Sequence, residues 1–294
     1  MQSFCDTFCK PTILTRKYGA FCSNKSKIWI RGQFQHHKGS LQLARTYNFT
    51  TNIVYIEKKC EEDYKRMVPF PSSTDLQAVL FDVDGTLCDS DPLHYLTFRD
   101  MLQEVGFQDG VPITEEFFSN NISGKHNDDI GATLFPDWDG NKCKKFFDDK
   151  EALFRSKAPQ HLKPINGLHK LCKWIESRGL RRAAVTNAPR ENAELMISLV
   201  GLTDFFELVV IGSECEQAKP FPDPYLKALE HFKIPAHRAF AVEDSTSGLK
   251  AAVGAGLAVL GITTRNPGQA LLEAGATFLI KDFEDPDLWN ALES

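Results

Sequence analysis

The segment Phe81–Leu87 carries the residues whose types and spacing point most directly to chemistry. Asp82 and Asp84 stand two residues apart, directly after a short apolar run, and Gly85 follows them. Glycine permits a tight reversal of the chain, whereas two carboxylates this close repel each other unless a cation or a shared proton relieves the repulsion. The segment therefore favours a metal-assisted or acid–base site over an ordinary acidic turn.

The elements that must position these carboxylates can be read from short apolar runs, which are typical of buried strands. The runs span 77–81, 182–185, 208–211, 239–242, 258–262 and 277–280. Helical patterns lie between them at 168–177, 191–200, 224–232, 247–255 and 269–274. This alternation predicts an α/β protein whose parallel sheet is covered on both faces. Because ligands bind beyond the carboxyl ends of such strands, Asp82 is expected at the edge of a crevice.

Residues 92–161 interrupt the alternation of strands and helices. They contain no apolar strand-like run, but amphipathic helical patterns occur at 93–105, 115–121 and 143–156. The economical interpretation is a small helical domain inserted after the first strand. We therefore expect three parts, which are an N-terminal extension at 1–74, a helical cap at 92–161, and a core formed by 75–91 together with 162–294.

Four motifs follow one another in a fixed order along the predicted core. They are Asp82-x-Asp84-Gly85-Thr86, then Val185-Thr186-Asn187-Ala188, then Lys219 in Ala218-Lys219-Pro220, and finally Glu243-Asp244-Ser245-x-x-Gly248. In this order and spacing they resemble the motifs of the haloacid dehalogenase superfamily of phosphohydrolases, and the resemblance spans 77–265. It implies a Rossmann-like core with a helical cap inserted after the first motif, which agrees with the pattern of elements.

The resemblance implies a role for each core motif. Asp82 should attack phosphorus to give an aspartyl-phosphate, and Asp84 should protonate the leaving alcohol and then deprotonate the attacking water. Thr186 and Asn187 should hydrogen-bond the transferring phosphoryl oxygens. Lys219 should place its ammonium against those oxygens and restrain Asp82.

The cofactor that the resemblance implies is Mg²⁺, which binds proteins through a few carboxylate oxygens together with phosphate and water. Asp82, Glu243 and Asp244 are expected to supply side-chain oxygens. Asp84 is expected to contribute its backbone carbonyl, which would leave its carboxyl group free for proton transfer.

Three segments, at 80–92, 124–127 and 181–198, resemble more narrowly the plant sugar-phosphate phosphatases of the branch that includes β-phosphoglucomutase. His94 stands where that mutase carries a hinge histidine, and Lys125 and Asn127 lie in a segment that resembles its substrate-specificity loop. Asn127 replaces the mutase arginine that holds the distal phosphate, although Lys125 could partly compensate. We expect a Mg²⁺-dependent phosphomonoesterase for small sugar phosphates, with a β-phosphoglucomutase-type phosphomutase as the alternative.

Other activities within the superfamily fit the sequence less well. A carbon–halogen hydrolase has no need of Asp84, and an ATP-driven pump would carry threonine at that position together with membrane helices. A non-catalytic binding module would have lost at least one catalytic group. All of the groups are present, namely Asp82, Asp84, Thr186, Lys219, Glu243 and Asp244.

Charge is distributed unevenly along the chain. Residues 1–56 carry eight Lys/Arg against one acid, whereas the whole chain has a formal net charge of −5. An acid-poor, basic start without an apolar stretch is typical of an organelle transit peptide. We therefore expect a chloroplast location, with the cytoplasm as the alternative if translation starts at Met67, and a mitochondrial location less favoured.

The rest of the composition is that of an ordinary globular protein. Apolar residues make up 42% of the chain, and no apolar stretch is long enough for a transmembrane helix. The eight cysteines form no CxxC pair, so a reducing compartment with free thiols is the simplest interpretation. We expect small phosphorylated metabolites as partners, no nucleic acid or membrane partner, and a monomer.

Overall fold

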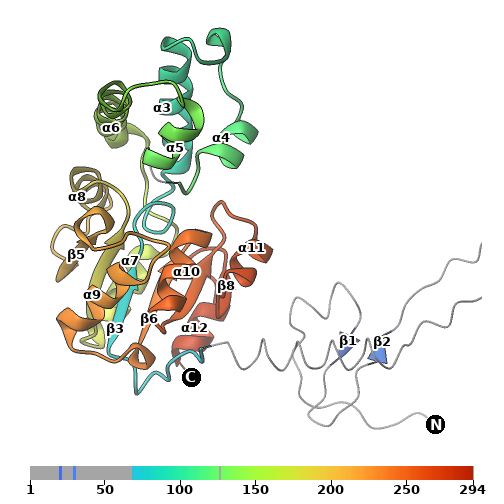
Figure 1. Cartoon of the computed structure of the whole chain (residues 1–294). Coiled ribbons are helices and arrows are strands. Elements are labelled where there is room, and N and C mark those ends of the chain that lie inside the picture. The colour runs from blue at the N-terminus through green and yellow to red at the C-terminus, as the bar shows by residue number, and fades with distance from the viewer. Residues whose placement is uncertain (1–19, 22–28, 31–67, 126, 294) are drawn as a thin grey trace, which may run out of the picture. The chain divides into compact units, whose positions relative to one another are not determined.

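The computed structural model describes residues 20–21, 29–30, 68–125 and 127–293 of a chain that divides into two units, Met1–Tyr55 and Ile56–Ser294. In the first unit, β1 (Ala20–Phe21) pairs in antiparallel fashion with β2 (Trp29–Ile30). The rest of the expected transit peptide lies outside the described residues. The second unit holds a sheet with flanking helices (Figure 1).

Six parallel strands form the sheet of the second unit, in the order β5-β4-β3-β6-β7-β8. They are β3 (Ala78–Phe81), β4 (Arg181–Thr186), β5 (Leu208–Ile211), β6 (Ala239–Glu243), β7 (Ala258–Ile262) and β8 (Phe278–Ile280). Each strand lies within one residue of its predicted bounds, and the parallel-sheet α/β fold is confirmed. Because β3 lies between β4 and β6, the residue that follows it, Asp82, lies between the carboxyl ends of those two strands.

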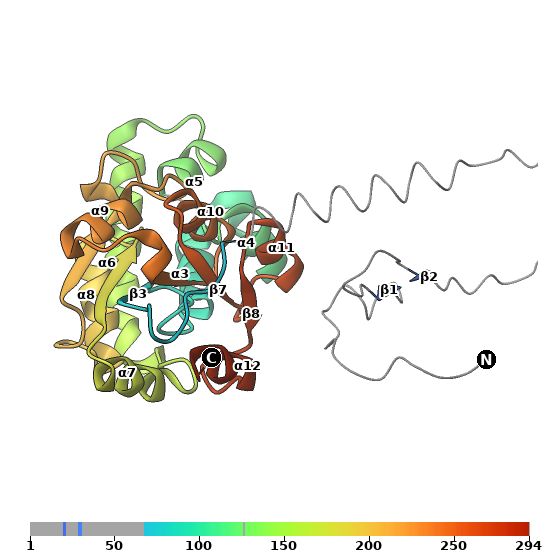
Figure 2. The same cartoon turned by 90° about the horizontal axis from the view of Figure 1, so that it is seen from below.

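Helices cover both faces of the sheet, since successive side chains of a strand point to opposite sides. Val79 and Phe81 of β3 belong to one apolar cluster, and Ala78 and Leu80 belong to the other. The helices packed in the first cluster are α7 (Leu168–Ser177), α8 (Arg190–Leu199) and α12 (Pro286–Glu293). Those in the second are α9 (Asp223–Phe232), α10 (Thr246–Gly254) and α11 (Gly268–Glu273). Figure 2 shows α7 and α12 on the side of the sheet opposite to α10 and α11.

The segment before β3 also contributes to this core. The ring of Phe70 lies 4.7 Å from that of Phe240 and 5.0 Å from that of Phe278, measured between centroids. The Thr277 hydroxyl donates a hydrogen bond to the carbonyl oxygen of Val68 at 3.4 Å. The expected N-terminal extension covers 1–74, but Phe70 near its end packs on the sheet.

The described residues between β3 and α7 form four α-helices, which we call the helical insert (91–161). The helices are α3 (Asp91–Glu104), α4 (Glu115–Asn121), α5 (Asn127–Leu134) and α6 (Gly140–His161). They share an apolar cluster of their own, with Phe98, Phe118 and Phe147 among its buried residues. Figure 1 shows the insert stacked beyond one end of the sheet. Among the described residues, none of the helices is both long and apolar enough to cross a membrane.

Two helices were not predicted, and one is longer than predicted. Helices α5 and α12 are each only eight residues long, and no strong periodic pattern marks them. Helix α6 begins three residues before its predicted start because the Asp139 carboxylate accepts hydrogen bonds from the backbone of Asn141 and Lys142. Such an N-cap satisfies backbone donors that the first turn of a helix leaves free.

Candidate active site

The carboxyl ends of three neighbouring strands bring the core motifs together. Asp82 follows β3, Thr186 ends β4 and Glu243 ends β6, and the parallel register pairs Phe81 with Ala184 on one side and with Val242 on the other. The backbone N–H of Asp82 extends this ladder by donating to the carbonyl of Val242 at 3.0 Å.

Lys219, from the segment between β5 and α9, is the cation at the centre of the site. Its ammonium donates to Asp82 Oδ1 at 2.7 Å, to Glu243 Oε1 at 2.7 Å and to the carbonyl of Val185 at 2.6 Å, and only 3% of the residue is exposed. Burial disfavours its charge, but the two carboxylates outweigh burial and raise the pKa of Lys219 above its usual value. Lys219 therefore holds one oxygen of the Asp82 carboxylate in place.

Asp82, Glu243 and Asp244 form an acidic cluster that could hold a metal ion, since one oxygen from each lies within 4.8 Å of the others. Burial raises the pKa of Asp82 to about 7 against the lowering effect of Lys219, and the neighbouring Glu243 adds to the rise. Burial, with Asp82 and Glu243 nearby, also raises the pKa of Asp244 well above its usual value. A divalent cation would relieve this repulsion.

Two further observations fit a cation or a phosphoryl group at this cluster. Asp82 Oδ2 is buried and has no hydrogen-bond partner, although buried polar atoms normally have one. Gly85 has a φ of +75°, and a Cβ atom there would overlap the carboxylate of Asp244. Glycine at this position thus lets Asp244 come close to the turn that follows Asp82.

Glu243 is held more firmly than the sequence indicated. Its Oε1 accepts hydrogen bonds from Lys219 and from the hydroxyl of Tyr225, the latter at 2.6 Å, and its Oε2 accepts one from Ser245 at 3.2 Å. Tyr225 is fully buried, and its part in the site was not predicted, although it stands in the Pro-rich segment that follows Lys219.

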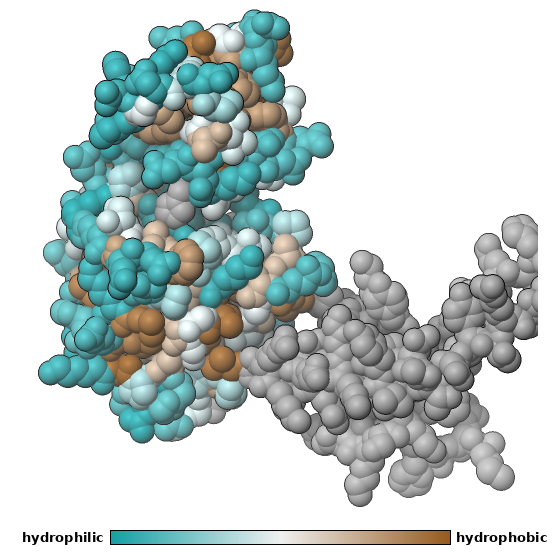
Figure 3. All heavy atoms as spheres, in the orientation of Figure 1, coloured by the Kyte–Doolittle hydropathy of each residue, from teal (hydrophilic) through white to brown (hydrophobic). Residues whose placement is uncertain are grey.

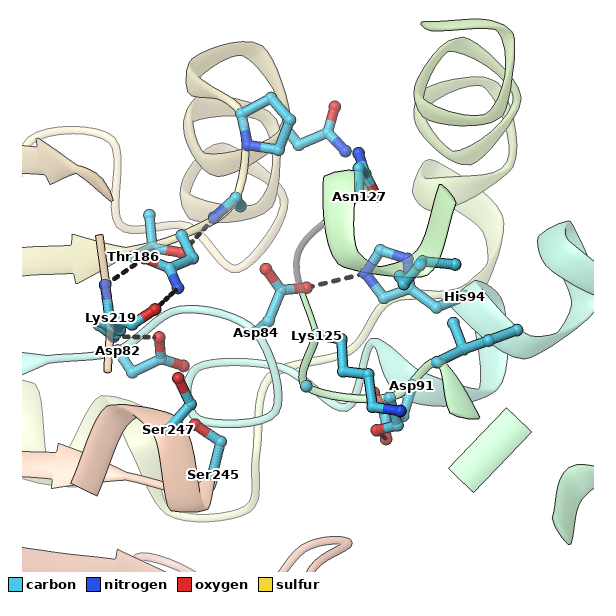
Figure 4. Close-up of a pocket in the computed structure, with 18 of the residues that line it drawn as sticks. Asp82, Asp84, Asp91, His94, Lys125, Asn127, Thr186, Lys219, Ser245 and Ser247 are labelled. Carbon is cyan, nitrogen blue, oxygen red and sulfur yellow. Dashed lines mark hydrogen bonds and ion pairs between the residues drawn. The ribbon is translucent and has the colours of Figure 1, made fainter. Parts of the chain in front are cut away.

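Asp84 lies apart from this cluster and contacts the helical insert instead. Its Oδ1 accepts a hydrogen bond from Ser90 at 2.8 Å. The same oxygen accepts one from His94 Nε2 at 3.0 Å (Figure 4). Burial alone would raise its pKa, but the hydrogen bonds and the charge of His94 outweigh burial and lower it. The cluster that could hold a metal ion among the described residues does not include the side chain of Asp84.

Thr186 is the last residue of β4 and Asn187 follows it, and the two side chains make different contacts. The Thr186 hydroxyl accepts a hydrogen bond from the backbone N–H of Ala188 at 3.0 Å. The Asn187 amide donates to the carbonyl of Lys219 at 3.0 Å and accepts from its backbone N–H at 3.1 Å. Asn187 thus fixes the backbone that carries the lysine, a function that the sequence analysis did not anticipate.

A cavity of about 330 Å³ separates these core residues from the helical insert, and a hollow is visible there in Figure 3. The predicted insert residues His94, Lys125 and Asn127 all line it. The His94 ring stacks on Phe154, with centroids 4.2 Å apart. Lys125 is exposed and donates to the carbonyl of Asn120 at 3.2 Å. His126, which completes the expected specificity loop, lies outside the described residues.

Three buried polar residues that line the cavity were not predicted from the sequence. They are Lys150 and Glu151 of α6 and Asn192 of α8. Charged residues on an amphipathic helix usually face solvent, so no signal in the sequence distinguished this pair from its exposed neighbours.

Comparison with known proteins identifies the family. A model described as haloacid dehalogenase-like hydrolase matches residues 79–262, and the chain belongs to this family. A phosphorylated carbohydrates phosphatase of Thermotoga maritima is 28% identical over 215 residues, which cover 71% of this chain and 96% of that protein. The expectation of a phosphatase of this family is thereby confirmed.

Two other similar proteins bear on the finer expectations. The solved structure of a putative β-phosphoglucomutase from Thermotoga maritima is 27% identical with a TM-score of 0.59, and the match covers 73% of this chain and 99% of that one. The chloroplastic protein SUPPRESSOR OF QUENCHING 1 of Arabidopsis thaliana is 26% identical, over 70% of this chain and 20% of that protein. The resemblance to phosphatases, mutase-like proteins and a plant member of the family is confirmed.

Proposed function

We propose that this protein is a Mg²⁺-dependent phosphomonoesterase that hydrolyses small sugar phosphates through an aspartyl-phosphate on Asp82. One observation carries the proposal. Asp82 has one carboxylate oxygen held by the Lys219 ammonium at 2.7 Å, while its other oxygen is buried without a partner beside the cavity. A nucleophile needs such an arrangement, in which one oxygen is anchored and the other is available to the phosphorus.

The first half-reaction forms a bond between an Asp82 oxygen and phosphorus and breaks the bond from phosphorus to the ester oxygen. Asp84 donates a proton to that oxygen, so that the sugar leaves as a neutral alcohol. Lys219 holds Asp82 in line and stabilises negative charge nearby, and the Thr186 hydroxyl is placed to hydrogen-bond a phosphoryl oxygen.

The second half-reaction needs the same carboxyl group of Asp84 in its ionised form. It removes a proton from water, the water oxygen bonds to phosphorus, and the acyl-phosphate bond breaks to restore Asp82 and release phosphate. The hydrogen bonds from Ser90 and His94 favour the ionised form in the arrangement described.

The acidic cluster suits Mg²⁺, with Asp82, Glu243 and Asp244 as its side-chain ligands and the Asp84 carbonyl as a further ligand. When bound, this cation would offset the repulsion between the carboxylates and the substrate phosphate and would polarise the phosphoryl group. The unpartnered oxygen of Asp82 and the close approach of Asp244 to Gly85 support this assignment.

The substrate class follows from the cavity and from the relatives. We infer that residues 92–161 act as a cap over a core formed by 75–91 and 162–294, because the cavity between them is of the size that a small metabolite needs. The phosphorylated carbohydrates named for the Thermotoga relative favour sugar phosphates. The mutase alternative draws on the contact between His94 and Asp84, but Asn127 offers no cation for a distal phosphate.

The remaining proposals concern the setting in which the enzyme acts. We place it in the chloroplast on the basic N-terminal composition, and the chloroplastic relative is compatible with that placement. Translation from Met67 would place it in the cytoplasm instead. A monomer with small phosphorylated metabolites as its partners remains the expectation.

The test of this function is phosphate release by residues 68–294 from a panel of sugar, polyol and nucleotide monophosphates, with Mg²⁺ or with EDTA. Release from several sugar phosphates that requires Mg²⁺ and is lost in EDTA would support the proposal. Absence of release, together with isomerisation of β-glucose 1-phosphate on addition of a sugar bisphosphate, would favour the mutase.

A further inference from the structure

A buried charged cluster lies in the cavity wall contributed by the helical insert. The Lys150 ammonium donates to Glu151 Oε1 at 2.8 Å, and the Asn127 amide donates to the same oxygen at 2.9 Å. Glu151 Oε2 accepts a hydrogen bond from the Asn192 amide of α8 at 2.6 Å. Every partner of this carboxylate is therefore a donor, and the cluster joins the insert to the core.

The burial of this cluster separates it from other charges on the same helix. Lys150 is 3% exposed and Glu151 is 7% exposed. The pair Lys144–Asp148 also lies on α6, but its side chains are 73% and 63% exposed. Replacing a buried ion pair by apolar residues of similar volume often leaves the stability of a protein unchanged or raises it. Stability alone therefore gives no reason for such a pair in the wall of a substrate cavity, whereas recognition of the substrate does.

We propose that Glu151 determines specificity by disfavouring substrates that carry a second anionic group. This inference rests on the proposed phosphatase function. It further specifies the charge of the substrate at the end away from the phosphate that is removed. The Lys150 ammonium is paired with Glu151, which offsets the attraction of Lys150 for a second phosphate or carboxylate, and the Glu151 carboxylate itself repels such a group. Specificity built on a repulsive contact of this kind favours monophosphates of neutral, hydroxyl-bearing molecules.

The wild type and its variants provide a charge series at one place. Glu151→Gln leaves Lys150 as an unpaired cation, Lys150→Met leaves Glu151 as an unpaired anion, and the double variant removes both charges. For each enzyme, kcat/KM is measured with fructose 1-phosphate and with fructose 1,6-bisphosphate. The ratio of bisphosphate to monophosphate should rise at least about tenfold in Glu151→Gln, fall in Lys150→Met and return close to the wild-type ratio in the double variant.

Asp148→Asn is the matched control, because it removes one negative charge from the exposed face of the same helix. It should leave the ratio unchanged, since exposed charges are screened by solvent and salt. A purely structural role of the pair would lower kcat/KM for both substrates together and leave the ratio constant, which would overturn the inference. If Glu151→Gln does not fold, Lys150→Met alone decides, because a ratio that does not fall contradicts the proposal.

Different results would overturn the phosphatase function and the role of Glu151. Absence of phosphate release from fructose 1-phosphate and from the wider panel by the wild type would overturn the phosphatase function, and with it this inference. Release by the wild type with a ratio that is the same in all variants would overturn the role of Glu151 alone.

Discussion

Replacing Lys219 by methionine removes the charge at the centre of the site while it keeps most of the apolar stem. The ammonium lies 2.7 Å from both Asp82 Oδ1 and Glu243 Oε1, and the side chain is 3% exposed. Loss of one partner from a buried ion pair costs about 3 to 5 kcal/mol, because the remaining charge is left buried and uncompensated. For a folded unit of this size, that free energy corresponds to a fall of about 6 to 20 °C in melting temperature.

The matched control is Lys144→Met, which breaks an ion pair of similar length, 2.6 Å, on the exposed surface of α6. Exposed pairs of this type contribute about 0.5 kcal/mol or less, so the melting temperature should change by about 2 °C at most. Calorimetry of both variants in metal-free buffer compares the two effects directly. Equal shifts for Lys219→Met and Lys144→Met would refute the reasoning that burial, and not distance, determines the contribution of Lys219. At a temperature where it remains folded, Lys219→Met should also lose at least about a hundredfold in kcat/KM.

Three further predictions address the surroundings of the nucleophile and the insert. Tyr225→Phe removes one hydrogen bond to Glu243 and should lower the free energy of unfolding by about 1.5 to 3 kcal/mol in urea titrations, and an unchanged midpoint would contradict that contact. Asn127→Arg places a guanidinium beside Glu151 and should raise the bisphosphate-to-monophosphate ratio of kcat/KM at least about fivefold. No change in bisphosphate or mutase activity would mean that this residue does not face the substrate. Burial alone would raise the pKa of Glu151, but Lys150 and the Asn127 amide outweigh burial and lower this pKa. The contribution of the Glu151 carboxylate to stability is therefore complete above its ordinary pKa of 4.5 and is lost as the pH falls through the lowered pKa. The urea midpoint should therefore fall more steeply in the wild type than in Glu151→Gln between about pH 5 and pH 3, and parallel curves would contradict this contribution.

The sequence predicted the sheet and the core motifs because both depend on local order along the chain. Apolar runs of four or five residues mark buried strands, and residues directly after them meet at one edge once the strands are parallel. Asp82, Thr186 and Glu243 could therefore be placed together without coordinates. Lys219 stands in a segment without regular structure, so no strand pattern could place it at the site. Its position in the order of the four motifs identified it instead.

The contacts that the sequence did not reveal join side chains from elements distant in the chain. Asn192 and Glu151 are 41 residues apart, and neither stands in one of the four core motifs. Asn187 was expected to bind the phosphoryl group, but its amide is engaged with the backbone of Lys219, which only the packing of the two segments could show. Helix α6 carries both exposed and buried Lys–acid pairs, and which of them face the cavity depends on how the insert packs against α8.

The most direct test of the central claim is phosphate release by Asp82→Asn, measured with Mg²⁺ on the best sugar phosphate of the panel. Asparagine keeps the shape of the side chain but is a far weaker nucleophile, and circular dichroism can verify that the variant is folded. The variant should lose at least about a thousandfold in kcat, because the amide of asparagine is too weak a nucleophile to form the bond to phosphorus efficiently. Folded Asp82→Asn that retains more than a small fraction of wild-type turnover would contradict the covalent mechanism.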